Sequence, residues 1–484
     1  MNKTAFRIFI FVSLCFMAMN LLAQQPVLTR KDTSEVRFIN SRKFWIYKVD
    51  KGETLFSISQ KFKIPQEEIH QFNPDIAANG LKAKVKLWIP AYSWAGKKTE
   101  GSSEELSSEE NNKIKNRRFR VVVFSAFELP KMYTGDLVSD SGYVNEKLSP
   151  DVKENLEFLE GILIAAKDFS DSEQQLELNI HDTENDSIKV KGIFLKQEVL
   201  SADLIITNSS GAVLDAINRY SIKFKIPLFC TSINVTETLR SNELAFALLP
   251  SSLLQCALMG KAGVELFKQA DYLLLKTGVL REDERVDSFK VGLLSGDKTP
   301  PIKRINFSKG YTESLKDSLN KSRLNVLFVA SSNEDIVSSL LSSLREIAVD
   351  YRIAVVGLPT WLHSQSIDPK LFDTCNTILF SASHINFASP EVLEFRKKFR
   401  DHYHTEPLDA AYLGYDALHI AIEKYSHQNR KKPKDKKKNL FKGIYSSYLF
   451  DQSPNGLCFE NNIIQLYKFE NAVPVYFKME DPIH

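Results

Sequence analysis

The pattern of apolar and polar positions separates a small N-terminal module from a long region in which short apolar runs alternate with helical spacing. In the small module, Tyr47 and Val49 are apolar at every second position, which predicts a strand. Leu55, Ile58 and Phe62 then follow at intervals of three and four, which predicts a helix. The pattern therefore indicates a strand that leads directly into a helix.

Residues typical of turns separate the predicted strands and helices of this small module. Asp50–Thr54 supplies a glycine for the turn and a threonine that can cap the first helix. Gln66–Phe72 predicts a second short helix, which ends at Asn73-Pro74 because the residue before a proline disfavours helical geometry. Leu87–Ile89 predicts a closing strand. We therefore expect the order strand, helix, helix, strand.

The long region predicts many strands separated by helices. The predicted strands are, in chain order, 119–124, 176–180, 204–206, 226–232, 272–275, 290–293, 325–329, 353–356 and 377–380. Helical spacing occurs at 156–169, 188–199 and 395–403. Strands separated by helical patterns of about 10–15 residues favour βαβ units and parallel sheets. Because one sheet of so many strands would be large, we predict an α/β region with two lobes.

Composition and charge narrow the class of protein. At 484 residues the chain is too long for one compact domain. Its 43% hydrophobic and 25% charged residues are typical of a globular protein, and its net charge of +3 gives no reason to expect nucleic acid as a partner. Residues 93–118 are rich in Lys, Glu, Ser and Gly and predict a flexible linker, while the basic run 430–438 predicts a solvated loop.

The first residues predict an export signal. Lys3 and Arg7 precede the apolar stretch 8–22, and Ala23 is a small residue at the expected cleavage site. Leu14 is too large for a typical lipoprotein cleavage site before Cys15, so we expect soluble export after removal of residues 1–23. No later apolar run approaches the roughly 20 residues of a membrane-spanning helix. We therefore expect no transmembrane segment after signal cleavage.

Export also makes disulfides chemically permissible. The cysteines that remain after cleavage are Cys230, Cys256, Cys375 and Cys458. Sequence alone leaves their three full pairings open. The wide spacing, with no C-x-x-C pair, argues against a thiolate zinc site or a redox pair. We expect most of these cysteines to be buried packing residues.

The small module resembles a LysM domain over residues 45–91. The resemblance rests on Tyr47-x-Val49-x-x-Gly52-x-Thr54-Leu55-x-x-Ile58, Asn73-Pro74 and Leu87-x-Ile89-Pro90. It implies a βααβ fold, in which two helices lie on one side of a two-stranded antiparallel sheet. It also implies binding to polymers that contain N-acetylglucosamine, chiefly peptidoglycan. Lys84 stands where the family often has glycine before the last strand.

The resemblance further implies where the glycan binds. One wall of the family's groove follows the first strand, and carried onto this chain it comprises Gly52, Glu53, Thr54, Leu55 and Phe56. The other wall follows the second helix and comprises Asn73, Pro74, Asp75 and Ile76. A shallow groove with backbone amides and carbonyls suits hydroxyl and acetamido groups. We expect the apolar side chains of Leu55 and Ile58 to belong to the core.

Residues 119–480 resemble the type 1 periplasmic-binding-protein fold of branched-chain amino acid receptors. The matching pieces are, in order, 121–124, 160–169, 178–183, 205–210, 225–228 and 411–418. The resemblance implies two lobes with parallel sheets that close on a ligand. It also places Asn208, Ser209 and Ser210 on a first ligand loop, Ser232 and Asn234 on a second, and Ser331 and Ser332 in the other lobe. Each of these residues is equally suited to capping a helix.

The sequence gives little support for catalysis. His402-Tyr403-His404 is an H-x-H pair of the kind some zinc endopeptidases have, but no His-x-x-x-Asp partner precedes it, because Asp368 follows His363 one residue too far along. The chain has no H-E-x-x-H, G-x-S-x-G, phosphate loop or G-x-G-x-x-G. We expect surface histidines, no catalytic residue, no metal and no cofactor.

Two functional classes remain open. In the first, a protein of the periplasm or cell envelope binds peptidoglycan and captures a small ligand, such as an amino acid or a wall-derived compound, in its two-lobed domain. In the second, the two-lobed domain is ligand-free and contacts a protein of cell-wall synthesis, as penicillin-binding-protein activators do. Convergent, available donors would favour the first class, and an exposed apolar surface would favour the second.

Overall fold

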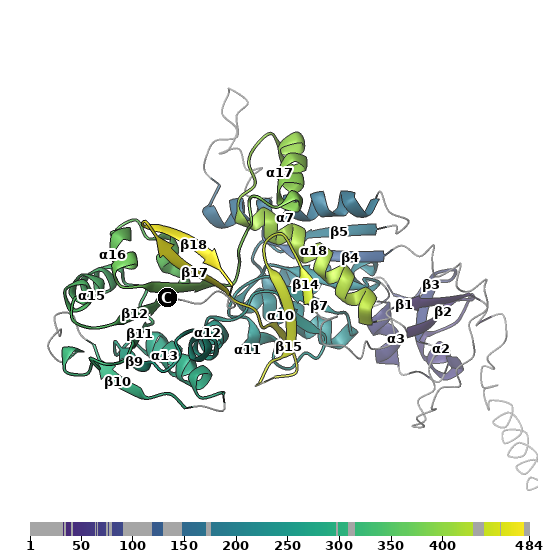
Figure 1. Cartoon of the computed structure of the whole chain (residues 1–484). Helices are drawn as coiled ribbons and strands as arrows, with labels where there is room; N and C mark the ends of the chain where they lie inside the picture. Colours follow the sequence, from purple (N-terminus) through teal and green to yellow (C-terminus); the bar gives the residue numbers. More distant parts are fainter. Residues whose placement is uncertain are drawn as a thin grey trace, which may run out of the picture. The chain divides into compact units, whose positions relative to one another are not determined.

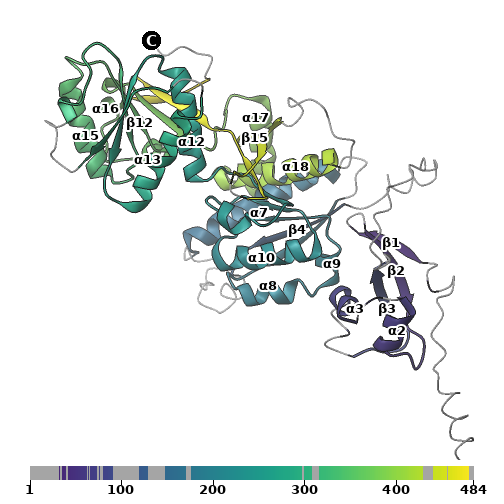
Figure 2. The ribbon, with the colours of Figure 1, turned by 90° about the horizontal axis from the view of Figure 1, so that it is seen from below.

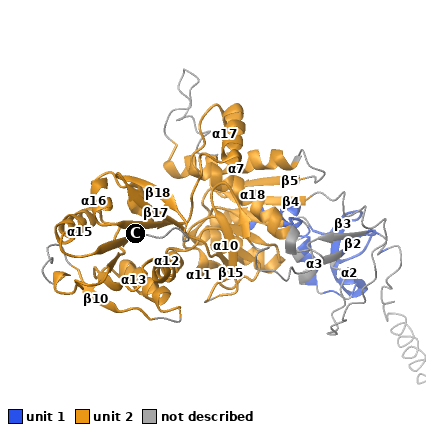
Figure 3. Ribbon diagram, in the orientation of Figure 1, with its two compact units in different colours: residues 1–117, 191–203 blue, residues 118–190, 204–484 orange. Residues whose placement is uncertain are grey.

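The computed structural model describes most of the chain and divides it into two compact units. One unit comprises residues 1–117 with 191–203, and the other comprises 118–190 with 204–484 (Figure 3). The described residues are 32, 35–39, 42–62, 64, 66–73, 76, 80–90, 119–128, 148–170, 176–296, 299–307, 315–428, 440–454 and 456–478. The predicted signal peptide (1–23), linker (93–118) and basic loop (430–438) lie outside them.

The small module has the predicted order of strand, helix, helix and strand. Its elements are β2 (Arg42–Lys48), α2 (Leu55–Phe62), α3 (Gln66–Phe72) and β3 (Lys86–Pro90). Strands β2 and β3 pair antiparallel, with Tyr47 opposite Leu87. The core of this module contains Ile58 and Ile69 from the helices, and Leu55 packs against it half-buried. The expectation that Leu55 and Ile58 belong to the core is confirmed.

A third strand corrects the expected two-stranded sheet. Strand β1 (Val36–Ile39) pairs antiparallel with β2, so that the sheet order is β1-β2-β3 (Figure 1). The pairing runs from Val36 opposite Trp45 to Ile39 opposite Arg42, which is the geometry of a tight hairpin. The added strand covers the edge of β2 that a two-stranded sheet would leave unpaired.

The turn before β3 shows how a lysine replaces the family's glycine. Lys84 has a φ of 71°, in the left-handed region that non-glycine residues seldom adopt. Its amide donates to the carbonyl of Val49 at 2.8 Å, and the amide of Val49 donates to the carbonyl of Val85 at 2.9 Å. The turn therefore forms in spite of the substitution, because neighbouring main-chain hydrogen bonds compensate its strain.

The large domain contains two sheets, which confirms the two-lobed α/β prediction. The first has eight strands in the order β14-β15-β16-β8-β7-β6-β4-β5. Its strands are β4 (Phe119–Ser125), β5 (Leu176–Asp182), β6 (Leu204–Thr207), β7 (Leu228–Cys230), β8 (Ala245–Ala247), β14 (Leu440–Lys442), β15 (Ser447–Gln452) and β16 (Phe459–Asn461). Strands β4 to β8 pair parallel with their neighbours.

Helices cover both faces of this first sheet. The helices along this part of the chain are α7 (Pro150–Ser170), α8 (Ser187–Ile193), α9 (Gln197–Leu200), α10 (Gly211–Phe224), α11 (Thr236–Leu239), α17 (Pro390–Tyr403), which packs on α7, and α18 (Asp409–Gln428). Helices α7 and α18 lie side by side on one face, and α10 lies on the other (Figure 2). The single helix predicted at 188–199 is wrong, because it is divided into α8 and α9. The chain turns at 194–196, after Gly192, a poor helix former.

The second sheet has seven strands in the order β10-β9-β11-β12-β13-β17-β18. They are β9 (Asp271–Lys276), β10 (Ile302–Asn306), β11 (Asn325–Val329), β12 (Ile353–Gly357), β13 (Thr377–Ser381), β17 (Gln465–Glu470) and β18 (Val473–Phe477). Its helices are α12 (Ser252–Leu266), α13 (Leu280–Leu293), α15 (Glu334–Ile347), α16 (Pro369–Thr374) and the 3-10 turn Pro359–His363. Helices α12 and α13 cover one face, and α15 and α16 the other (Figure 2).

The predicted strand 290–293 is wrong. These residues are the last turn of α13, whose buried side chains Val286, Phe289 and Leu293 follow helical spacing. A short apolar run does not distinguish a buried strand from a buried helix segment. The strand at this point of the chain is instead β10, at the edge of the sheet.

The chain crosses between the two sheets three times, after β8, after β13 and after β16. The segment that crosses after β13 is joined to the turn between β14 and β15, since the His384 amide donates to the Tyr445 carbonyl at 3.1 Å and the Ser446 hydroxyl to the Ala382 carbonyl at 2.8 Å. The buried carboxylate of Asp416 accepts from the amides of residues 444–446 and from the hydroxyl of Tyr448. Burial raises the pKa of Asp416 to about 6, against the opposing effect of these hydrogen bonds.

Two helix pairs pack backbone against backbone through glycine. A Cβ on Gly161 of α7 would lie 1.9 Å from the carbonyl oxygen of Ala411, and one on Gly414 of α18 would lie 2.0 Å from that of Phe158. Gly260 of α12 and Gly292 of α13 repeat this arrangement in the second lobe. Each lobe therefore requires glycine at a helix crossing. Among the described residues, no helix has the length and hydropathy that would let it span a membrane.

Replacing Gly161 or Gly414 by alanine should destabilise the large domain. The added methyl group collides with main-chain atoms, so the two helices must separate, and overpacking of this kind costs about 3 kcal/mol. Denaturant unfolding followed by circular dichroism measures the loss. The matched control is Gly192→Ala on α8, where a Cβ would meet nothing within 4 Å, and it should stabilise by about 0.5 kcal/mol. Equal stability of all three variants would contradict the close packing.

Candidate functional site

The loop between β2 and α2 carries the first predicted wall of the glycan groove. Gly52 has a φ of 92°, which favours glycine, and its backbone is exposed. Thr54 caps α2 as predicted, because its hydroxyl accepts from the Ser57 amide at 3.1 Å while the Ser57 hydroxyl accepts from the Thr54 amide at 3.0 Å. These reciprocal bonds fix the direction in which the loop enters the helix.

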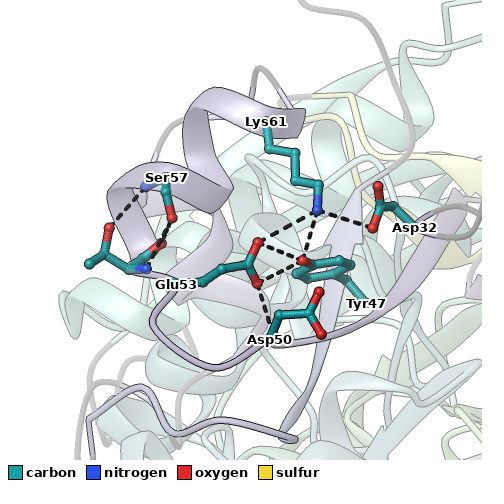
Figure 4. A network of polar contacts seen from close by, with 7 residues as sticks. Asp32, Tyr47, Asp50, Glu53, Ser57 and Lys61 are labelled. Atoms are coloured by element: carbon teal, nitrogen blue, oxygen red, sulfur yellow. Dashed lines mark hydrogen bonds and ion pairs between the residues drawn. The ribbon is translucent and has the colours of Figure 1, made fainter. Parts of the chain in front are cut away.

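Glu53 has a different part in this loop from the one its position suggests. Its carboxylate accepts from the Tyr47 hydroxyl at 2.6 and 2.7 Å and from the Asp50 amide at 2.9 Å (Figure 4). Its own amide donates to the Asp50 carbonyl at 3.4 Å. Lys61 lies 3.5 Å from the same carboxylate. The side chain is therefore occupied within the module, and it holds the loop closed.

Phe56 is the most exposed large side chain of this wall. Its exposed fraction is 60%, although it lies in the first turn of α2. An exposed aromatic ring next to main-chain amides provides an apolar surface on which a sugar ring can stack. Thr54 and Gly52 are exposed beside it in sequence. The wall can therefore offer main-chain polar groups, one hydroxyl and one ring to a glycan.

The second predicted wall is described only in part, since Pro74 and Asp75 lie outside the described residues. Asn73 is buried, and its amide group donates to the carbonyls of Ile69 and Trp88, both at 2.8 Å. Its side-chain oxygen accepts from the Trp88 amide at 2.7 Å. Ile76 is buried in the core. The side chains of Asn73 and Ile76 therefore join the end of α3 to β3, and any glycan contact from them would come from the main chain.

The predicted ligand residues of the first lobe lie at the carboxyl ends of its parallel strands. Asn208 follows β6, and its amide group donates to the side chain of Asn155 at 2.7 Å. The Ser232 hydroxyl, after β7, donates to the Asn208 carbonyl at 2.5 Å. Neighbouring strands thus bring Asn208 and Ser232 together, as the order of strands implies. Their donors are used within the protein.

Ser210 and Asn234 lie at helix starts. Ser210 is the N-cap of α10 but makes no side-chain capping hydrogen bond. Asn234 has a φ of 59°, and its side-chain oxygen accepts from the Ser252 amide at the start of α12 at 2.8 Å. Asn234 thus acts partly as a helix cap, because its side-chain oxygen accepts from the first residue of α12. The Ser210 hydroxyl does not cap α10 and is exposed at the loop.

In the second lobe, the Glu282 carboxylate binds one of the predicted ligand residues. Ser331 follows β11 and is buried, and its hydroxyl donates to the Glu282 carboxylate at 2.9 Å. The Thr277 hydroxyl, after β9, donates to the other carboxylate oxygen at 2.5 Å. Sequence reasoning missed Glu282, although the charged run 281–285 after the crossing was a signal. Ser332, next along the chain, is exposed.

The strand ends also present unused polar atoms and exposed apolar side chains. The hydroxyl oxygens of Ser125, the last residue of β4, and of Ser209 after β6 are buried and have no hydrogen-bond partner among the described residues. Large apolar side chains are exposed beyond the ends of β7, β8 and β9. Ile233 and Val279 lie on loops, and Leu253 and Leu280 lie in the first turns of α12 and α13. The loop of Ile233 is joined to the start of α12 by the hydrogen bond from the Ser252 amide to Asn234.

The described residues offer no set of groups arranged for catalysis. Burial raises the pKa of the Cys230 thiol to about 12, so this cysteine stays protonated and packs in the core. Cys256, Cys375 and Cys458 are likewise buried with free thiols, which confirms their prediction as packing residues. His402 and His404 are exposed at the end of α17, as expected. In the described part of the chain, no three His, Cys, Asp or Glu side chains gather as metal ligands.

The fold and these sites define a protein with two modules, a LysM domain and a two-lobed domain of the type 1 periplasmic-binding-protein fold. Residues 47–90 match the family model described as "LysM domain". A putative branched-chain amino acid ABC transporter from Rhodospirillum rubrum has a similar structure, with a TM-score of 0.52 at 13% identity, over 75% of this chain and 100% of that chain. A comparison with curated proteins found no match.

Two structures of LpoA from Haemophilus influenzae are also similar. Full-length LpoA has a TM-score of 0.48 at 12% identity, over 75% of this chain and 59% of that chain. The LpoA C-domain, described as a regulator of PBP1A, has a TM-score of 0.48 at 11% identity, over 74% of this chain and 100% of that chain.

Replacing Asn73 by alanine should destabilise the LysM domain. The substitution removes three hydrogen bonds and leaves the half-buried Trp88 amide without the Asn73 acceptor, which costs about 2 kcal/mol. In denaturant unfolding followed by tryptophan fluorescence, the transition to which Trp45 and Trp88 contribute should shift, whereas that of Trp361 in the large domain should not. Gln60→Ala, at an exposed position of α2, is the control and should leave the midpoint unchanged. An unchanged midpoint for the Asn73 variant would show that its amide does not hold α3 to β3.

Proposed function

We propose that this chain is a non-catalytic protein of the cell envelope or periplasm that binds peptidoglycan through its LysM domain. The single observation that carries the proposal is the LysM match at 47–90, over a module whose core and first groove wall are formed. The groove residues Gly52, Glu53, Thr54, Leu55, Phe56, Asn73, Pro74, Asp75 and Ile76 remain the proposed binding region. Within it we propose that Thr54, Phe56 and main-chain groups contact the glycan directly, whereas Glu53 and Asn73 hold the surrounding main chain in place.

A single LysM domain is suited to keeping a protein at the wall. It buries little surface against a thin glycan chain, so one contact is weak. The polymer, however, repeats its binding site many times, and a protein that dissociates rebinds at a nearby site. The LysM domain therefore localises the chain, and the two-lobed domain has the more specific task.

For the two-lobed domain we propose contact with a protein partner of cell-wall synthesis. The donors of Asn208, Ser232 and Ser331 are used inside the protein, which leaves fewer groups to recognise a polar small molecule. Exposed apolar side chains lie at the same strand ends, among them Val279 and Leu280. Contiguous exposed apolar surface is typical of interaction sites.

Small-ligand capture is the second candidate for this domain. The buried hydroxyls of Ser125 and Ser209 have no partner in the part of the chain that the structure describes, and such groups commonly bind a ligand or an ordered water. Ser210, Ser332 and Asn234 complete the loops that the fold would use, although the Asn234 oxygen already serves Ser252. No cofactor is required by either candidate.

Phe56→Ala should weaken binding of the full chain to insoluble peptidoglycan about ten-fold, since the variant loses the stacking surface but no core contact. Sedimentation with purified peptidoglycan at increasing protein concentration measures the affinity. The matched control is Val85→Ala, an exposed apolar position of the same module outside the proposed walls. Equal retention of both variants and the parent would show that the groove lies elsewhere.

Native mass spectrometry of the full chain separates the two candidates for the large domain. We expect no retained small molecule, and no thermal shift on addition of amino acids or muropeptides. A retained molecule whose binding is lost in Ser209→Ala would instead establish small-ligand capture and overturn the interaction proposal for these strand ends.

A further inference from the structure

A buried charge network connects the N-terminal segment of the small module to the glycan loop. The Lys61 ammonium, at the end of α2, lies 3.0 Å from the Asp32 carboxylate and donates to the Tyr47 hydroxyl at 2.9 Å. That hydroxyl donates in turn to Glu53. Only 9% of Asp32 and 11% of the Lys61 side chain are exposed, so solvent screens the charges weakly. Asp32, Lys61, Tyr47 and Glu53 thus form one continuous chain of contacts (Figure 4).

Asp32 stands outside the residues that define the family. The LysM model matches 47–90, whereas Asp32 precedes β1, the strand that is additional to the expected sheet. Strand β1 pairs with β2 over four residue pairs, and the Ile46 amide donates to the Glu35 carbonyl at 2.8 Å. The segment is therefore attached to the module by a regular sheet, and it brings the Asp32 carboxylate within 3.0 Å of the Lys61 ammonium.

The position of Lys61 depends on having a carboxylate on each side. The ammonium is 3.0 Å from Asp32 but 3.5 Å from Glu53, so its closer ion pair is with Asp32. Without Asp32, the buried ammonium would have Glu53 as its remaining carboxylate. A buried cation moves toward an available anion, because leaving it unpaired costs several kcal/mol. Lys61 would then compete with Tyr47 and with the Asp50 amide for the Glu53 oxygens.

This competition acts on the glycan loop itself. The bond from the Asp50 amide to Glu53, together with the bond from the Glu53 amide to the Asp50 carbonyl, closes residues 50–53 into a fixed turn. The main-chain groups of that turn lead directly into Thr54 and Phe56. A sugar that binds main-chain amides requires them in a fixed geometry, and a loosened loop must be ordered again on binding.

We propose that Asp32, held to the module by strand β1, is a positioning residue for peptidoglycan binding. Asp32 takes the shorter of the two ion pairs of Lys61, at 3.0 Å against 3.5 Å to Glu53, and Glu53 is thereby left to close the loop that contacts the glycan. The inference rests on the proposed function, since it concerns the affinity of the same groove.

The test uses the full chain with Asp32→Asn, which keeps the shape of the side chain and removes its charge. We expect binding to insoluble peptidoglycan to weaken about five-fold, the size of one lost hydrogen bond. Hydrogen exchange should accelerate at the Asp50 amide and stay unchanged at the Leu87 amide in β3. The matched control is Glu35→Gln, which removes an exposed ion pair to Lys86 in the same segment and should leave affinity unchanged.

A double variant distinguishes positioning from a loss of stability. In Asp32→Asn with Lys61→Met, no ammonium remains to compete for Glu53, so affinity should return to within about two-fold of the parent. If Asp32 only stabilised the fold, the double variant would bind peptidoglycan as weakly as Asp32→Asn alone. That result would overturn the proposal. So would unchanged affinity of Asp32→Asn. Failure of the parent chain to bind peptidoglycan would instead refute the proposed function.

Discussion

Glu53 closes the loop after β2 through both its main chain and its side chain, and the proposed recognition surface of the LysM domain depends on this closure. The carboxylate accepts from the Asp50 amide and from Tyr47, while the Glu53 amide donates to Asp50. Thr54 then caps α2 and Phe56 projects from its first turn. The polar side chains of this region thus build the loop, and the loop presents main-chain groups, a hydroxyl and a ring. This division suits a ligand whose hydroxyl and acetamido groups repeat along a chain.

In the large domain, too, some polar side chains stabilise the fold through internal hydrogen bonds, while other surfaces stay exposed to solvent. Asp416 accepts from three main-chain amides in the turn between β14 and β15 and from a tyrosine hydroxyl, and it requires Gly443, on which a Cβ would lie 1.9 Å from the carboxylate. At the strand ends, Glu282 and Asn155 accept from Ser331 and Asn208, two residues of the proposed ligand loops. Two buried hydroxyls, exposed serines and several exposed apolar side chains lie beside them.

Strong local patterns made much of the fold predictable from sequence. The helix periods at Leu55–Phe62 and Gln66–Phe72, and the β-branched strands at 325–329 and 353–356, match the structure closely. The failures occur where local pattern is ambiguous. Residues 290–293 form a short apolar run that suits a strand or a helix, and tertiary packing of Phe289 and Leu293 decides for the helix. Strand β1 is stabilised by pairing with β2, and the sequence of residues 36–39 alone does not predict that pairing.

The location of the glycan groove stays a prediction from the motif, and the structure shows what the side chains placed there do. Glu53 and Asn73 bond to Tyr47 and Trp88, partners that the motif spacing does not assign to them. Glu282 was missed because its partners Thr277 and Ser331 meet only when β9 and β11 pair. Competition binding measures peptidoglycan recognition most directly. The full chain should bind purified insoluble peptidoglycan saturably and be released by soluble N-acetylglucosamine oligomers. Absence of binding, or binding that these oligomers do not displace, would contradict a LysM-based attachment to the wall.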